Sequence, residues 1–142
     1  MRILAVDHGQ KQIGLALSDE TGMLARPLAI VLHVSKLVDA ANVAEHALRH
    51  EAGLIIVGVS YDEDGNPNPA GRRALSFMEV LSQQTHIPLQ TWDESFTTQD
   101  ARAARLASGA PRKKRGGHLD HVAAAVLLQD YLDNHPLLNH EK

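Results

Sequence analysis

The chain has 142 residues, and its 14 Lys and Arg against 17 Asp and Glu give a formal net charge of -3. This length predicts a single domain over residues 1–142 and excludes a two-lobed kinase or a long dehydrogenase. Because the chain has no Cys, disulfides, thiolate zinc sites, iron–sulfur clusters and cysteine nucleophiles are excluded. No apolar run approaches the roughly 20 residues that cross a bilayer, and no signal peptide is recognisable. We therefore expect a soluble cytoplasmic protein with no membrane partner.

The first third of the chain predicts three strands before any helix. Short apolar runs separated by polar, turn-like residues occur at 3–6, 13–18 and 28–32. Ser35 is expected to cap the first helix, and Gly53 follows its end. The apolar stripe of this helix is predicted to consist of Leu37, Ala41, Ala44 and Leu48.

The middle of the chain predicts a strand, a loop and a helix. The β-branched run at 54–57 is typical of a buried parallel strand, and the segment at 58–69 is rich in acids, Gly and Pro, as surface loops are. Asn68 and Pro69 indicate the cap and first residue of a second helix. Its buried stripe is predicted to consist of Ala74, Phe77, Met78 and Leu81.

The last third predicts one more strand, at 88–92, and two helices. Thr97 is expected to cap a third helix, which ends at Gly109. A final helix is expected from about His118 to Asp133, followed by a short tail over about 134–142. The order therefore begins βββαβαβα, with a further helix at the end. This α/β order, with a mixed five-stranded sheet flanked by helices, is that of the ribonuclease-H-like fold.

Three acids stand where such a fold would gather them. Asp7 ends the first strand, Glu94 follows the fifth, and Asp120 lies in the first turn of the last helix. Each has a purely structural alternative, since Asp favours turns and acids are stabilised near helix N-termini. If the first, fourth and fifth strands are parallel, however, Asp7 and Glu94 lie at the carboxyl ends of strands, where open α/β sheets bind ligands.

Asp120 also borders the predicted buried stripe of the last helix. Residues at helical spacing from it are Ala124, Leu127 and Tyr131. A carboxylate there needs a cationic partner, either a metal ion or a buried Arg. Three carboxylates without soft ligands favour Mg²⁺ or Mn²⁺ over zinc. Two such ions about 4 Å apart can activate a water and stabilise the leaving oxygen in phosphodiester cleavage, which predicts a nuclease.

The histidines offer a weaker alternative. His46 and His50 have the i, i+4 spacing of helical zinc ligands, but Ala47 stands where a metalloprotease has its catalytic Glu. A solvated helix face is the favoured interpretation of this pair.

Several motifs together resemble the YqgF family of small bacterial proteins, also described as Holliday junction resolvase-like. They are Val6-Asp7-His8-Gly9, Ile13 to Asp19, Ile56-Val57-Gly58, Asp64-Gly65, Trp92-Asp93-Glu94, Thr97-Thr98, Arg112 to Arg115, and Asp120 with Ala123-Ala124. The resemblance implies a ribonuclease-H-like fold and a cytoplasmic nuclease that acts on the 5′ end of pre-16S rRNA. It also implies that Asp7, Glu94 and Asp120 are the catalytic, metal-binding residues.

The chain departs from the family pattern at a few positions. Ser95 stands where the family usually has Arg, so a cation beside Glu94 is missing. Resolvases of the related fold generally carry a fourth acid three positions after the last-helix Asp, and here that position is Ala123. This difference weighs against full resolvase activity and for RNA processing.

The overall acidic charge argues against nucleic acid, but its distribution reverses that argument. Residues 101–119 carry +6 and the remaining 123 residues carry -9. The predicted phosphate-binding residues are Lys11, Arg112, Lys113, Lys114 and Arg115. The expected partner is precursor rRNA, with branched DNA or a non-catalytic RNA-binding role in ribosome assembly as alternatives. A junction nuclease would require a dimer, so both a monomer and a homodimer remain open.

Overall fold

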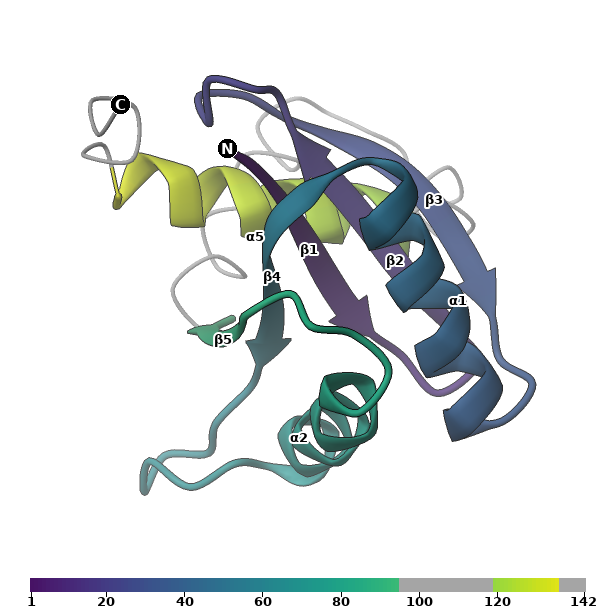
Figure 1. Cartoon of the computed structure of the whole chain (residues 1–142). Coiled ribbons are helices and arrows are strands. Elements are labelled where there is room, and N and C mark those ends of the chain that lie inside the picture. The colour runs from purple at the N-terminus through teal and green to yellow at the C-terminus, as the bar shows by residue number, and fades with distance from the viewer. Residues whose placement is uncertain (95–118, 136–142) are drawn as a thin grey trace.

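The chain folds into one mixed sheet with helices on both faces (Figure 1). The structure is a computed structural model that describes residues 1–94 and 119–135, with the backbone alone at 119–121. Its elements are β1 (Arg2–His8), β2 (Gln12–Ser18), β3 (Ala25–Leu32), α1 (Lys36–Arg49), β4 (Ala52–Val59), α2 (Pro69–Ser82), β5 (Leu89–Asp93) and α5 (Leu119–Asp133). The order predicted for these elements is confirmed. The helix predicted from Thr97 to Gly109 lies outside the described residues.

The sheet places β1 at its centre, in the order β3-β2-β1-β4-β5. β2 pairs antiparallel with β1 and with β3, whereas β4 pairs parallel with β1 and with β5. The parallel pairing predicted for the first, fourth and fifth strands is therefore confirmed, and their carboxyl ends meet at one edge of the sheet. Among the described residues, no helix is long and apolar enough to cross a membrane.

Alternate residues of β1 contribute to two separate cores. Leu4 and Val6 pack with the α1 and α2 side chains, whereas Ile3 and Ala5 pack with α5. Because successive strand residues point to opposite faces, Asp7 belongs to the α5 face. His8 belongs to the other face, where its ring lies 4.9 Å from the ring of Phe77 in α2.

Helix α1 docks through a different stripe from the predicted one. Ser35 caps it as expected, since its side chain accepts a hydrogen bond from the Val38 amide. The buried residues are Asp39, Ala40, Val43 and Ala47, whereas Leu37 and Leu48 are 61% and 75% exposed. The sequence prediction missed the true stripe because it contains a buried acid. Asp39 is satisfied there by the His33 ring, at 2.6 Å, and by the Val34 amide, at 2.9 Å.

Helix α2 begins as predicted, with Asn68 as its cap and Pro69 as its first residue. The Asn68 Oδ1 accepts hydrogen bonds from the Gly71 amide and from the Ser60 hydroxyl, both at 2.8 Å. This oxygen thus closes the loop between β4 and α2 as well as capping the helix. Of the predicted stripe, Ala74, Phe77 and Leu81 are buried, and Met78 is partly buried.

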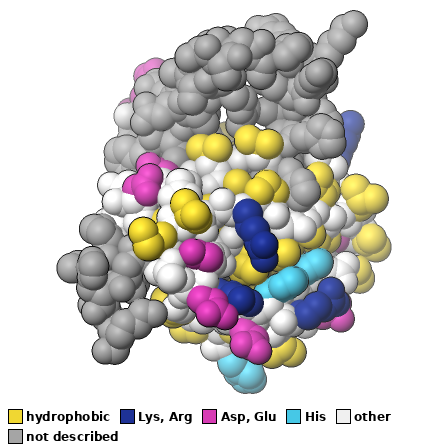
Figure 2. Space-filling model, turned by 90° about the horizontal axis from the view of Figure 1, so that it is seen from above, with side chains coloured by type: hydrophobic (Ala, Val, Ile, Leu, Met, Phe, Trp, Pro, Cys, Tyr) yellow, Lys and Arg dark blue, Asp and Glu magenta, His cyan; other side chains and the backbone are white. Residues whose placement is uncertain are grey.

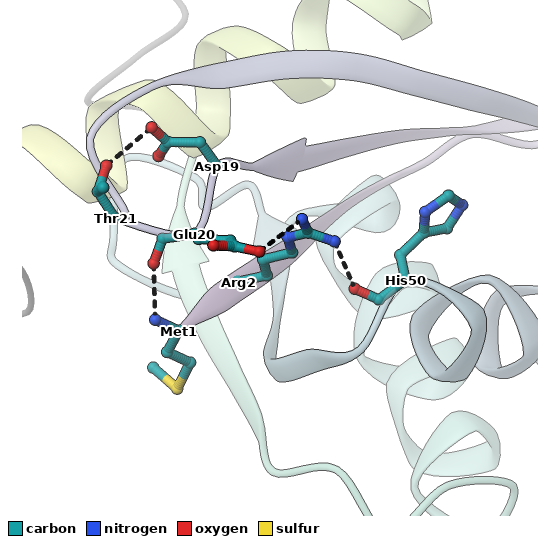
Figure 3. Close-up of polar contacts among 6 residues, drawn as sticks. All are labelled: Met1, Arg2, Asp19, Glu20, Thr21 and His50. Carbon is teal, nitrogen blue, oxygen red and sulfur yellow. Dashed lines mark hydrogen bonds and ion pairs between the residues drawn. The ribbon is translucent and has the colours of Figure 1, made fainter.

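Arg2 ties together three segments at the amino end of β1 (Figure 3). Its guanidinium donates to Glu20 Oε1 at 3.1 Å and to the His50 carbonyl at 3.5 Å, and so joins β1 to the β2–β3 turn and to the end of α1. The amino group of Met1 donates to the Glu20 carbonyl at 2.9 Å. Figure 2, turned to show the molecule from above, shows basic, acidic and histidine side chains close together on one face.

Candidate functional site

Asp7 lies on the α5 face of the sheet between two glycines of the adjacent strands. Its partner on β2 is Gly14, and the pairing of Val6 with Val57 places Gly58 beside it on β4. Gly58 in turn pairs with Trp92 on β5. The half-buried Asp7 side chain therefore has a glycine as its neighbour on each adjacent strand.

Glu94 reaches the same place from the end of β5. Its backbone amide donates to the Val59 carbonyl at 3.0 Å, which extends the β4–β5 ladder by one residue. A Cβ atom on Gly58 would lie 2.5 Å from Glu94 Oε1 and 2.8 Å from Glu94 Cγ. The Glu94 carboxylate thus lies over Gly58, next to the position of Asp7, and the structure brings these two predicted residues to one point of the α5 face.

Asp120 lies in the first turn of α5, as predicted, and its side chain is outside the described residues. The residues at helical spacing from it, Ala124, Leu127 and Tyr131, are all buried. The same hypothetical Cβ on Gly58 would lie 2.9 Å from Leu127 Cδ2. Helix α5 therefore begins about two turns before the residue that packs beside Gly58 and Glu94.

Polar contacts fix the second half of α5 to both edges of the sheet, near β3 and near β5. Gln129 accepts from the Ala25 amide and donates to the Met23 carbonyl, both at 2.9 Å. At the β5 edge, the Trp92 indole donates to Asp130 at 2.8 Å and the Tyr131 hydroxyl donates to Gln90 at 3.1 Å. These bonds hold the helix in one register over the strands that carry Asp7 and Glu94.

The side chains that meet over Gly58 offer hard oxygen ligands for a metal ion. Asp7 and Glu94 offer carboxylate oxygens, which suit Mg²⁺ or Mn²⁺ better than zinc. His8 belongs to the opposite face and packs on Phe77. No group of three His, Cys, Asp or Glu side chains that could hold a metal occurs among the described residues, which include two of the three predicted ligands.

His8 lies among charged groups on the α1 and α2 side of the sheet. Burial lowers the pKa of His8 from its ordinary value of 6.5. The charges of Arg73, His33 and Lys36 lower this pKa further, whereas Asp39 raises it. A neutral ring packed on Phe77 is therefore favoured at neutral pH.

Of the predicted phosphate-binding residues, only Lys11 lies in the described part of the chain. It is exposed in the turn between β1 and β2, and its carbonyl accepts from the His33 amide at 2.9 Å. Lys11 is thus at the same end of the sheet as Asp7. Arg112, Lys113, Lys114 and Arg115 lie outside the described residues.

A protein-family model described as RuvX, Holliday junction resolvase, matches residues 1–134. The chain belongs to this family. A relative from Anaeromyxobacter sp. (strain Fw109-5), named "Putative pre-16S rRNA nuclease", is 36% identical over 94% of this chain and 97% of its own length. A relative of the same name from Clostridium beijerinckii is 35% identical over 94% of this chain and 96% of its own length. The family predicted from the sequence motifs is confirmed.

Solved structures of resolvases have a similar fold. RuvC of T. thermophilus, in complex with Holliday junction substrate, has a TM-score of 0.60 at 20% identity, over 96% of each chain. Fowlpox virus resolvase, in complex with Holliday junction DNA, has a TM-score of 0.55 at 16% identity, over 94% of this chain and 98% of its own. This RuvX-family chain therefore has the ribonuclease-H-like fold that the order of elements predicted.

The sequence prediction named the acids but not the glycines between them. Gly14 and Gly58 are the strand neighbours of Asp7, and Gly58 leaves the space that Glu94 occupies. A glycine inside a strand is a recognised sign of a close approach. Gly58 follows the β-branched run at 54–57 directly and carries that sign.

Proposed function

We propose that this RuvX-family protein is a divalent-metal-dependent nuclease that processes the 5′ end of pre-16S rRNA in the cytoplasm. The observation that carries this proposal is the position of the Glu94 carboxylate over Gly58, the strand neighbour of Asp7. The names of relatives at 35% and 36% identity support the substrate. The carboxyl ends of parallel strands are also the usual place for ligands in open α/β sheets.

In this proposal Asp7, Glu94 and Asp120 hold one or two Mg²⁺ or Mn²⁺ ions. When bound, such ions offset the charge of the carboxylates and polarise the phosphodiester. The chain's own contribution is orientation: the β1 ladders hold Asp7 on both sides, and the amide bond to Val59 holds Glu94. Helix α5 covers the adjoining apolar surface, so water is excluded from one side of the site.

Basic side chains would bind the phosphates that flank the cleaved bond. Lys11 lies at the same end of the sheet as Asp7, and Arg112, Lys113, Lys114 and Arg115 belong to the segment of charge +6. Backbone contacts of this kind position a nucleic acid without reading its sequence.

Cleavage of branched DNA is a second candidate, favoured by the family description and by the likeness of the fold to junction resolvases. Such an activity would require a homodimer with two sites facing one junction, whereas RNA processing is compatible with a monomer. Ala123, at the position of the fourth acid of resolvases, argues for RNA.

The test is cleavage of a 5′ pre-16S rRNA leader and of a four-way DNA junction by the full chain, with Mg²⁺, with Mn²⁺ and with chelator. We expect metal-dependent cleavage of the RNA that is lost in Asp7→Asn, a variant of nearly the same shape. Unchanged cleavage by Asp7→Asn would overturn the assignment of the site. Cleavage of the junction alone would favour the second candidate.

A further inference from the structure

A group of basic side chains lies on the α1 and α2 face of the sheet, opposite the face to which Asp7 belongs. We call His33, Lys36 and Arg73 the basic cluster, since all three act electrostatically on the His8 ring. His33 follows β3, Lys36 is the first residue of α1, and Arg73 lies in α2. Three segments thus converge at the end of the sheet where β1 ends.

One short contact and the spacing of residues along α2 place Lys36 and Arg73 at the same end of the sheet. The Lys36 Nζ donates to the Ser76 hydroxyl at 2.7 Å and so bridges α1 and α2. Arg73 is three residues before Ser76 and four before Phe77, hence on the same side of α2 as both. Phe77 packs against His8 at 4.9 Å, which brings the cluster up to the end of β1.

Lys36 and Arg73 have no acidic partner among the described residues, whereas His33 is paired with the Asp39 carboxylate. Asp39 is the only acid among the charged groups that act on His8, and it is 1% exposed and engaged by His33 and the Val34 amide. Within the described part of the chain, Lys36 and Arg73 form no ion pair. By contrast, Arg49, at the other end of α1, pairs with Glu45 at 3.2 Å.

Backbone geometry favours an anion at the same place. Both α1 and α2 begin at the edge where β1 and β4 end, as their positions in Figure 1 show. Helix N-termini carry partial positive charge, so this charge adds to that of Lys36 and Arg73. The loop between β4 and α2 projects away from α1 in Figure 1. The side chains of His33, Lys36 and Arg73 are all exposed.

We propose that Lys36 and Arg73, with His33, bind a backbone phosphate of the RNA strand a few nucleotides from the bond cleaved at Asp7. This inference rests on the proposed function and adds a second contact point to it. Asp7 and His8 are adjacent residues whose side chains point to opposite faces, so the two points are separated by the edge of the sheet. A nucleic-acid strand carries one charged phosphate per nucleotide, so a strand that crosses this edge presents phosphates to both points.

The test compares two double variants that remove the same charge from the same two helices. Lys36→Gln with Arg73→Gln removes the proposed contact. Arg49→Gln with Arg72→Gln is the control, because Arg49 is paired with Glu45 and Arg72 donates to the Pro67 carbonyl at 3.1 Å. Binding of the 5′ pre-16S leader RNA, and separately of a four-way DNA junction, to each full-length protein is measured by anisotropy, in chelator and over a range of salt.

We expect the first variant to reduce the slope of log affinity against log salt by about 0.7 to 1, the change that one lost phosphate contact produces, and the control to match the parent. Equal slopes in all three proteins, or an equal loss in the control, would overturn the proposal. So would a contrast seen only with junction DNA. If the double variant fails to fold, Lys36→Gln and Arg73→Gln are tested singly, each with a slope lower by up to about 1.

The outcome is separable from that of the proposed function. Binding in chelator requires no cleavage, so the contrast between the two double variants stands or falls without the metal site. If Asp7→Asn abolishes cleavage and the contrast is absent, the basic cluster is rejected and the nuclease is retained. If the contrast is present and Asp7→Asn still cleaves, the cluster is supported and the metal site is rejected.

Discussion

The Glu94 carboxylate occupies the space that a side chain at position 58 would fill, so Gly58 and Glu94 are compatible only because residue 58 has no Cβ. A Cβ there would lie 2.5 Å from Glu94 Oε1 and 2.9 Å from Leu127 Cδ2. Glu94 is a flexible side chain that can move, whereas Leu127 is buried, so an added Cβ would also overpack the core beneath α5. Gly58 is therefore a positioning residue for Glu94.

We predict that Gly58→Ala reduces RNA cleavage on the order of 100-fold, because misplacement of a catalytic group by about 1 Å has an effect of that size. The free energy of unfolding should fall by at most about 1–3 kcal/mol, the usual cost of overpacking against a buried side chain such as Leu127, which leaves the protein folded in the assay. Gly53→Ala is the matched control, since the atoms nearest to its added Cβ belong to the Met1 side chain and the Arg2 carbonyl, at the other end of β4. Gly58→Ala with parental cleavage would show that Glu94 has no required position.

Divalent metal should stabilise the folded protein through Asp7 and Glu94. A ligand present at 100 times its dissociation constant adds about 2.7 kcal/mol to the free energy of unfolding. We expect Mg²⁺ or Mn²⁺ to raise the unfolding temperature of the parent and of Glu79→Gln, an exposed control on α2. Asp7→Asn should show no such rise. An equal metal-induced rise in Asp7→Asn would place the metal elsewhere.

The sheet was largely predictable from the chain because its signals are local. Apolar runs of strand length, Ser35 before α1 and Asn68-Pro69 before α2 each act within a few residues. The docking face of α1 was not predictable in the same way. Leu37 and Leu48 suggested one stripe, but Asp39, held by His33 and Val34, turns a different stripe to the core.

For the candidate site, the residues could be predicted from local sequence, whereas their meeting place could not. Asp7 and Glu94 could be named because acids at strand ends are recognisable one at a time. Their meeting over Gly58 depends on the register of β1 against β4 and of β4 against β5. That register is a property of the folded sheet, and nothing in the sequence around Gly58 indicates that Glu94 will lie over it.

Asn68 should contribute to stability through two bonds made by one oxygen. Loss of a helix cap costs about 0.5–2 kcal/mol, and Asn68→Ala also removes the acceptor of the Ser60 hydroxyl. We expect a lower free energy of unfolding in urea with an unchanged m-value. Asn68→Asp keeps the oxygen and should remain close to the parent. An equal loss in both variants would mean that the amide nitrogen, not Oδ1, matters.

The sequence favoured a solvated helix face for His46 and His50, and both side chains are half-buried. Their rings stack with centroids 6.3 Å apart, and His46 Nδ1 is buried without a hydrogen-bond partner among the described residues. Burial lowers the pKa of His46 from 6.5, and the charges of Arg49 and His50 lower it further, whereas Glu45 raises it. Protonation of His46 is therefore harder in the folded chain than in the unfolded one.

This difference predicts a loss of stability in acid. Well above the ordinary pKa of 6.5 the ring is neutral in both states, and at pH 6.5 it is already half protonated in the unfolded chain alone. As the pH falls from there to the lower pKa of the folded state, the unfolded chain binds more protons and the free energy of unfolding decreases. His46→Asn should reduce this decrease in urea unfolding between about pH 5 and 8, and only partly, because burial lowers the pKa of His8 as well. His86→Asn, at an exposed position, is the control. If His46→Asn leaves the pH profile as unchanged as His86→Asn does, the half-buried His46 ring has no part in the acid loss of stability.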